Sequence, residues 1–68
     1  MKVQLNGEPH ELDDGATVAD VVVLLGRGPE ARGVAVAVEA EVVPRTAWGD
    51  HELHDGDRIE VLTAIQGG

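Results

Sequence analysis

Apolar and polar residues alternate along three stretches of the chain, residues 2–6, 33–38 and 58–65. A period of two is typical of a β-strand with one buried face, so each stretch is predicted to be a strand. The residues on the alternating apolar side are Val3, Leu5, Val34, Val36, Val38, Ile59, Val61, Thr63 and Ile65. Because Ala35 and Ala37 are also apolar, we expect the middle strand to be covered on its other face too.

Two shorter strands are predicted beside these three. Asn6-Gly7 is a strong hairpin signal because both residue types tolerate a positive φ, so a strand near residues 9–12 should fold back on the first. Pro9 lacks an N–H group, so that strand is expected either to begin at Pro9 or to lie at a sheet edge. The pair Glu39-Ala40 is expected to form a turn before another short strand, residues 41–43.

The period changes to that of a helix between residues 17 and 25. The apolar residues at helical spacing are Val18, Val21, Val22 and Leu25. Thr17 is predicted to cap the helix N-terminus, with Asp20 completing a capping box. Gly26, followed by Gly28-Pro29, is expected to end the helix.

The predicted order β-β-α-β-β-β favours one α+β domain. The first and last strands are the most regular, so we place them side by side and parallel at the centre of the sheet. A mixed sheet of four to five strands packed on one main helix is a β-grasp, the ubiquitin-like arrangement. The domain is predicted to span residues 1–65, with residues 66–68 as a flexible tail. A helical turn at 46–49 should anchor Trp48, the single aromatic residue, over one end of the core.

Composition narrows the function classes. Thirteen acidic residues against five basic ones give a net charge of −8, which argues against binding nucleic acid or an anionic membrane. Such a surface suits solubility or the attraction of a basic protein partner. The apolar runs are too short to span a bilayer, and no signal peptide opens the chain, so we expect a cytoplasmic protein. The absence of cysteine excludes thiolate chemistry and disulfides.

The polar motifs do not form a convincing catalytic or metal site. The segment 51–55, His-Glu-Leu-His-Asp, lacks the spacing that places two histidines one helical turn apart. The aspartate pairs at 13–14 and 55/57 flank glycine turns, where Asp is favoured for local hydrogen bonds. We therefore expect no enzyme activity, no metal and no cofactor.

The last six residues, Thr-Ala-Ile-Gln-Gly-Gly, raise a separate question. Glycine has the largest backbone entropy and adds nothing to a core. The pair Gly67-Gly68 is either a fraying chain end or a segment that must pass through a space too narrow for side chains.

The whole chain resembles the ThiS family of sulfur carriers, the ubiquitin-like proteins of bacterial thiamin biosynthesis. The resemblance begins with the Asn6-Gly7 hairpin and the Asp14-Gly15-x-Thr17-Val18 segment before the helix. It continues through Val43-Pro44-Arg45-x-x-Trp48, Leu53-x-Asp55-Gly56-Asp57-x-Ile59-Glu60 and the terminal Gly67-Gly68. Molybdopterin-synthase small subunits share the Asp-Gly-Asp turn and the ending but usually lack the Val-Pro-Arg-x-x-Trp segment.

The resemblance implies a mechanism in which the main-chain terminus is the reactive group. An ATP-dependent, ThiF-like adenylyltransferase related to ubiquitin E1 would adenylate the Gly68 carboxylate, with Gln66 and Gly67 threading the partner's channel. A persulfide, such as that of a cysteine desulfurase, would convert the adenylate to a thiocarboxylate. A ThiG-like thiazole synthase would then receive the sulfur. Since the chain ends at Gly68, no protease would be needed.

Several alternatives remain open at this point. The acceptor could belong to another pathway, such as that of molybdopterin, or the chain could be a ubiquitin-like tag conjugated through Gly68. It could also be an acidic binding module with an incidental tail. Arg45 and Ile65 are candidate partner contacts, although Arg45 could equally be a solvated loop residue, and Trp48 is most simply a lid on the core.

Overall fold

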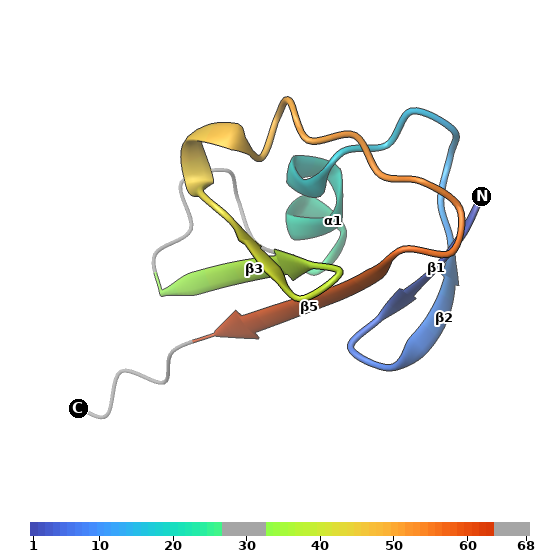
Figure 1. The fold of residues 1–68 in the computed structure, drawn as a ribbon, viewed down its shortest axis with the longest axis horizontal. Coiled ribbons are helices and arrows are strands. Elements are labelled where there is room, and N and C mark those ends of the chain that lie inside the picture. Colours follow the sequence, from blue (N-terminus) through green and yellow to red (C-terminus); the bar gives the residue numbers. More distant parts are fainter. Residues whose placement is uncertain (27–32, 64–68) are drawn as a thin grey trace.

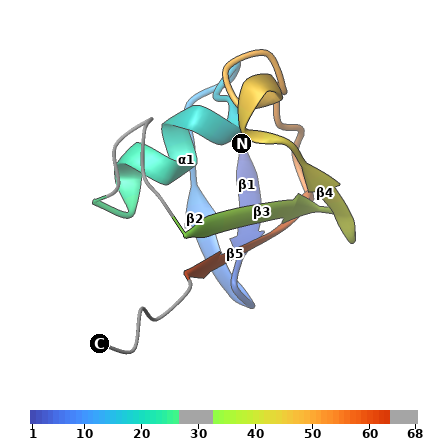
Figure 2. The ribbon, with the colours of Figure 1, turned by 90° about the vertical axis from the view of Figure 1, so that its left-hand side faces the viewer.

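The computed structural model describes residues 1–26 and 33–63. The elements in order are β1 (Lys2–Leu5), β2 (Glu8–Glu11), α1 (Val18–Leu24), β3 (Val34–Val38), β4 (Glu41–Val43), the 3-10 helix η1 (Arg45–Ala47) and β5 (Arg58–Thr63). The strands form one mixed sheet in the order β2-β1-β5-β3-β4, and α1 packs across one face of it (Figures 1 and 2). The predicted α+β β-grasp fold is confirmed. The predictions for Gly28-Pro29 and for residues 64–68 lie outside the described residues.

The centre of the sheet has the predicted arrangement. β1 and β5 are parallel neighbours, with Leu5 opposite Ile59, and β3 pairs antiparallel with β5 on its other side. The β1–β2 hairpin turns at Asn6 and Gly7, whose φ values are +51° and +84°, as the Asn-Gly sequence predicts. β2 lies at the sheet edge, where Pro9 is tolerated because the outer side of that strand needs no partner.

Helix α1 begins as the sequence predicts. The Thr17 hydroxyl accepts a hydrogen bond from the Asp20 N–H, and the Asp20 carboxylate accepts one from the Thr17 N–H, which completes the capping box. Two further N–H groups near this end are bonded by a neighbouring loop: Val18 donates to the His51 carbonyl and Ala19 to the Trp48 carbonyl. This loop thereby supplies partners that a helix start lacks within itself.

The far end of α1 differs from the prediction. Val18, Val21 and Val22 are fully buried, but Leu25, predicted to lie on the same apolar face, is 40% exposed. The reason is that the helix is only seven residues long and ends at Leu24. Leu25 is its C-cap, with ψ of +10°, and lies one residue beyond the last residue of the helix. The prediction that Leu25 belongs to the core is wrong.

The predicted covering of both faces of β3 is also wrong. Val36 and Val38 are buried in the core, whereas Ala35 is exposed and Ala37 only half-buried. α1 packs on one face of the sheet (Figure 2). The other face, which we call the outer face, therefore carries apolar positions of β3 that no described element covers.

The core is aliphatic except for Trp48, which is 3% exposed. The chain turns through η1 just after β4, and the Trp48 indole Nε1–H donates to the Val43 carbonyl at 3.0 Å. Buried indoles usually find such a partner. The predicted helical turn and the role of Trp48 as a core residue are confirmed, although the turn begins one residue earlier than predicted.

Candidate functional site: the C-terminal strand and the outer face

The central strand β5 leads directly to the C-terminal segment. Gln66, Gly67 and Gly68, and the candidate contact Ile65, lie outside the described residues, so the structure leaves their predicted roles untested. Thr63 is the last described residue before them. The geometry of β5 therefore sets the point from which the C-terminal segment starts.

β5 is held along both sides. Ile59 and Val61 are 1% and 7% exposed and point into the core. On the β3 side the ladder runs to Thr63, which lies opposite Val34. At the start of the strand, the Arg58 N–H donates to the Glu39 carboxylate at 2.6 Å, and the Glu39 N–H donates to the Arg58 carbonyl at 2.8 Å.

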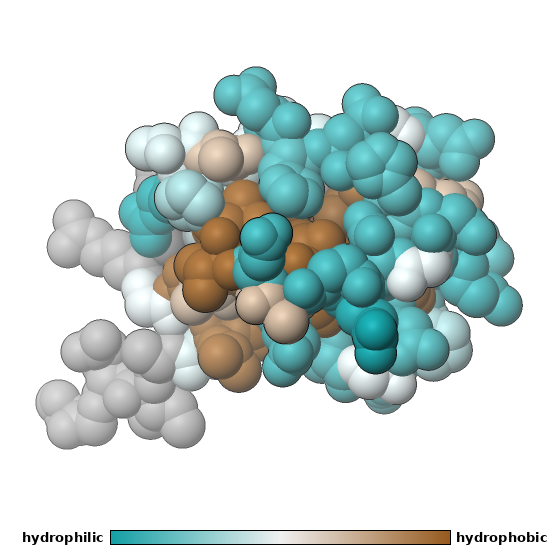
Figure 3. Space-filling model, viewed as in Figure 1, coloured by the Kyte–Doolittle hydropathy of each residue, from teal (hydrophilic) through white to brown (hydrophobic). Residues whose placement is uncertain are grey.

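An apolar surface lies on the outer face beside β5. We call it the outer patch, and its residues are Ala35, Ala37, Val42 and Leu62. Leu62 lies opposite Ala35 and Val42 opposite Ala37. Leu62 and Val42 are 65% and 74% exposed. In the space-filling view, apolar surface gathers over the part of the molecule that holds β3, β4 and β5 (Figure 3).

Acidic residues border the outer patch. Glu60 lies opposite Ala37, and its side chain is exposed. Glu39, in the turn between β3 and β4, is 3.7 Å from the Arg58 guanidinium. The patch is thus an apolar surface with a mostly acidic edge, next to the strand that leads to Gly68. Sequence reasoning missed it, although Leu62 interrupts the polar positions of β5 and so gave a signal.

Arg45 lies over the ring of Trp48, with its guanidinium carbon 5.6 Å from the ring centroid. This is within the range of a cation–π contact. Together with the hydrogen bond from Trp48 to the Val43 carbonyl, this contact gives three residues of the Val-Pro-Arg-x-x-Trp segment a structural role within the domain. The predicted partner contact through Arg45 stays a prediction.

The polar motifs singled out in the sequence have local structural roles. Lys2 donates its N–H to the Asp55 carboxylate at 2.7 Å, and His54 donates its N–H to the Asp57 carboxylate at 2.9 Å. These bonds hold the turn before β5. Within residues 1–26 and 33–63, no group of three or more His, Asp or Glu side chains is placed to hold a metal ion.

In the same ranges, no helix is long and apolar enough to cross a membrane.

Comparison with known proteins identifies relatives over nearly the whole chain. Residues 3–68 match the ThiS family. The chain is 41% identical to the sulfur carrier protein ThiS of Thermus thermophilus, over 97% of this chain and 98% of that protein. The fold is similar to a crystal structure of the thiamine biosynthesis protein ThiS from Geobacter metallireducens, with a TM-score of 0.80, 30% identity and full coverage of both chains.

A second kind of relative is much longer. The chain is 43% identical, over all 68 of its residues, to part of a thiazole synthase from Magnetococcus marinus. The chain spans about a fifth of that protein, 20% of its length. A segment similar to the whole of this chain therefore occurs within a protein named for thiazole synthesis.

Proposed function

This chain belongs to the ThiS family, the sulfur carriers of thiamine biosynthesis, and we propose that the carboxylate of Gly68 is the group on which it carries sulfur. The chain acts as a carrier and not as an enzyme. The observation that supports Gly68 is that the family match extends through the terminal glycine pair, residues 67 and 68, which are separated from the end of the central strand by three residues, 64–66, in the sequence.

The proposed reaction has three steps. A carboxylate oxygen of Gly68 attacks the α-phosphorus of ATP on an E1-like adenylyltransferase, and pyrophosphate leaves. The terminal sulfur of a persulfide, supplied by a protein such as a cysteine desulfurase, then attacks the acyl carbon and displaces AMP. A thiol cleaves the resulting S–S bond, which leaves a thiocarboxylate on Gly68. ATP-dependent activation suits the cytoplasmic location expected from the sequence.

Glycine at both terminal positions suits this chemistry. With no Cβ atom, Gly67 and Gly68 allow close approach of the backbone to a partner and adopt an extended path with little steric restriction. In the proposed complex, Gln66 and Gly67 lie in a narrow channel, and Gly68 reaches the nucleotide.

The acceptor we propose is a thiazole synthase. Its support is the thiazole synthase of Magnetococcus marinus, one fifth of which is similar to this whole chain. When a carrier and an acceptor work in succession, a covalent link between them raises the effective concentration of one for the other.

We further propose that the outer patch is where the adenylyltransferase docks. The patch adjoins β5, so a partner seated there is beside the strand that leads to Gly68. Its edge residues Glu39 and Glu60 are acidic and exposed, so a partner with an apolar contact surface and basic residues around it is complementary.

Docking at the patch predicts a specific effect of Leu62→Lys. Leu62 is 65% exposed, and burying a leucine side chain contributes about 1.5–3 kcal/mol. The substitution should raise the KM of the carrier in adenylation at least about tenfold, since each 1.4 kcal/mol is roughly a factor of ten. Adenylation is measured by ATP–pyrophosphate exchange at varied carrier concentration.

Leu24→Lys is the matched control, because Leu24 is similarly exposed, at 55%, but lies on α1. Both variants gain the same charge, so a general electrostatic effect changes both equally. An equal rise of KM in the two variants would contradict docking at the patch.

The proposed function itself is tested by intact mass after incubation with the adenylyltransferase, ATP, cysteine and a desulfurase. We expect replacement of one oxygen by sulfur, localised to Gly68 by fragmentation. An unchanged mass with a demonstrably active partner would reject the carrier role of Gly68. Formation of an amide with lysines of other proteins, in place of the thiocarboxylate, would instead favour the ubiquitin-like tag.

A further inference from the structure

The pairing between the two central strands, β1 and β5, stops before β5 ends. Backbone pairing between β1 and β5 covers Gln4 with Arg58 and Leu5 with Ile59. The Asn6 N–H makes a last backbone bond to the Ile59 carbonyl at 2.9 Å, and the chain then turns away toward β2. β5 continues to Thr63, so its final residues have no backbone of β1 beside them.

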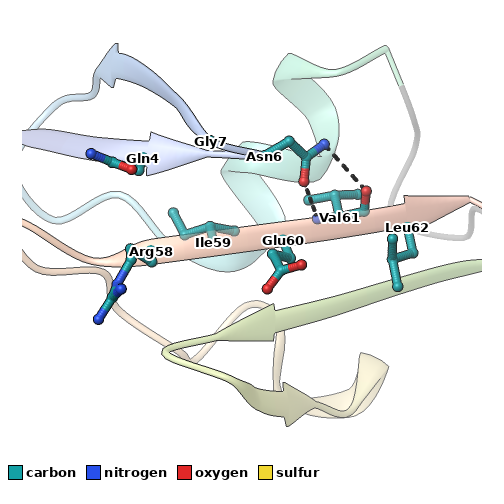
Figure 4. A pocket seen from close by; sticks show the side chains of 8 residues that line it. All are labelled: Gln4, Asn6, Gly7, Arg58, Ile59, Glu60, Val61 and Leu62. Atoms are coloured by element: carbon teal, nitrogen blue, oxygen red, sulfur yellow. Dashed lines mark hydrogen bonds between the residues drawn. The ribbon is translucent and has the colours of Figure 1, made fainter.

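The side chain of Asn6 takes the place of the missing strand (Figure 4). The Val61 N–H donates to Asn6 Oδ1 at 2.8 Å, and Asn6 Nδ2 donates to the Val61 carbonyl at 3.3 Å. A carboxamide carries the same donor and acceptor as a peptide group. The two bonds therefore extend the ladder on this side of β5 by one residue, and we call them the Asn6 clamp.

Asparagine meets two requirements at position 6: a positive φ in the turn, and a side chain that both donates to and accepts from the Val61 backbone. The turn requires a positive φ, which is +51° at Asn6 and is well tolerated by Asn, Asp and Gly. Ionised aspartate has no hydrogen to donate to the Val61 carbonyl, and glycine has no side chain. The positive φ of the turn alone does not require Asn. Only Asn both tolerates this φ and makes the two hydrogen bonds to the Val61 backbone.

We propose that Asn6 is a positioning residue for the carrier reaction. The β3 ladder holds one edge of β5 as far as Thr63, and the Asn6 clamp holds the other edge at Val61, where β1 no longer lies beside it. The end of the strand is thereby fixed from both sides. This inference rests on the proposed function of Gly68. A partner that draws in Gly68 must order every residue that the domain does not already hold. Each residue to be ordered lowers affinity by about five- to thirtyfold, so a strand fixed up to its end favours binding.

The test is Asn6→Gly, which creates a Gly-Gly turn compatible with the hairpin but removes the clamp. We expect the KM of the carrier in ATP–pyrophosphate exchange to rise about three- to thirtyfold, with kcat unchanged, because the ordering of the strand end is completed on binding. We also expect faster hydrogen exchange at the Val61 amide, which the clamp protects in the native protein.

Thr17→Ala is the matched control. It removes the helix cap, where the Thr17 hydroxyl accepts the Asp20 N–H, and so destabilises the domain without touching β5. Unfolding of both variants is followed by the fluorescence of Trp48. A merely structural role of Asn6 predicts that both variants keep the native KM, or shift it equally, once their folded fractions are matched.

The outcomes separate this inference from the function on which it rests. Native Val61 exchange in Asn6→Gly would overturn the clamp, and a KM equal to that of Thr17→Ala would overturn its role in positioning. Failure of the native protein to be adenylated would overturn the proposed function, and the inference with it. A selective rise in KM together with faster exchange at Val61 would support the proposal.

Discussion

Adding one residue after Gly68 is expected to lower the rate of adenylation at least about a hundredfold. The added residue moves the carboxylate by roughly 3.3–3.6 Å, the length of one extended residue. A misplacement of about 1 Å already costs on the order of a hundredfold when reacting atoms must be aligned. The rate is measured as ATP–pyrophosphate exchange with the carrier's own adenylyltransferase.

Deletion of Gly68 is the companion variant, because it moves the carboxylate by the same distance in the opposite direction. Both variants should keep the native midpoint of denaturant unfolding, since no residue of the core is changed. Intact mass before and after the assay shows whether the extended protein has been trimmed. Adenylation of the untrimmed, extended protein at the native rate would contradict the role proposed for Gly68.

Features that depend on a few neighbouring residues were predictable from the sequence. The turn at Asn6-Gly7 follows from two residues that tolerate positive φ, and the capping box from Thr17 and Asp20 three positions apart. The parallel pairing of β1 and β5 is not local, but it was predicted because these two strands alternate most regularly. In each case the local pattern and the tertiary structure favour the same conformation.

Features that depend on where elements end or how strands align were not predictable. The exposure of Leu25 follows from the end of α1 at Leu24, and the exposure of Ala35 from the packing of α1 on the opposite face. The bond between Asn6 and Val61 joins residues 55 positions apart, so it depends on the register of the first and last strands. No local pattern encodes such a register.

In the candidate site, too, the contiguous motif was predictable from the sequence and the surface built from several strands was not. The terminal glycines were found because the motif is contiguous and ends the chain, but their role requires a partner, so it stays a proposal. The outer patch combines Ala35 of β3, Val42 of β4 and Leu62 of β5. Its residues form one surface only when the three strands are aligned.

Gly67→Val is expected to lower adenylation by about ten- to a hundredfold while leaving the stability of the domain unchanged. The valine side chain adds branched bulk where the proposal places a narrow channel, and overpacking of a tight space costs typically 1–3 kcal/mol, which corresponds to roughly 5- to 150-fold. The loss is measured by ATP–pyrophosphate exchange, and stability by Trp48 fluorescence during denaturant unfolding.

Gly49→Val carries the same change to a glycine in the described domain. A Cβ atom built at Gly49 meets no other atom within 4 Å, and its φ is not in the left-handed region, so the substitution is accommodated there. Loss of adenylation in Gly67→Val but not in Gly49→Val would therefore arise from the partner's channel. If both variants were adenylated at the native rate, the channel would have room for a side chain at position 67. The glycine at that position would then be only part of a fraying chain end, the simpler of the two readings that the terminal Gly67-Gly68 pair allows.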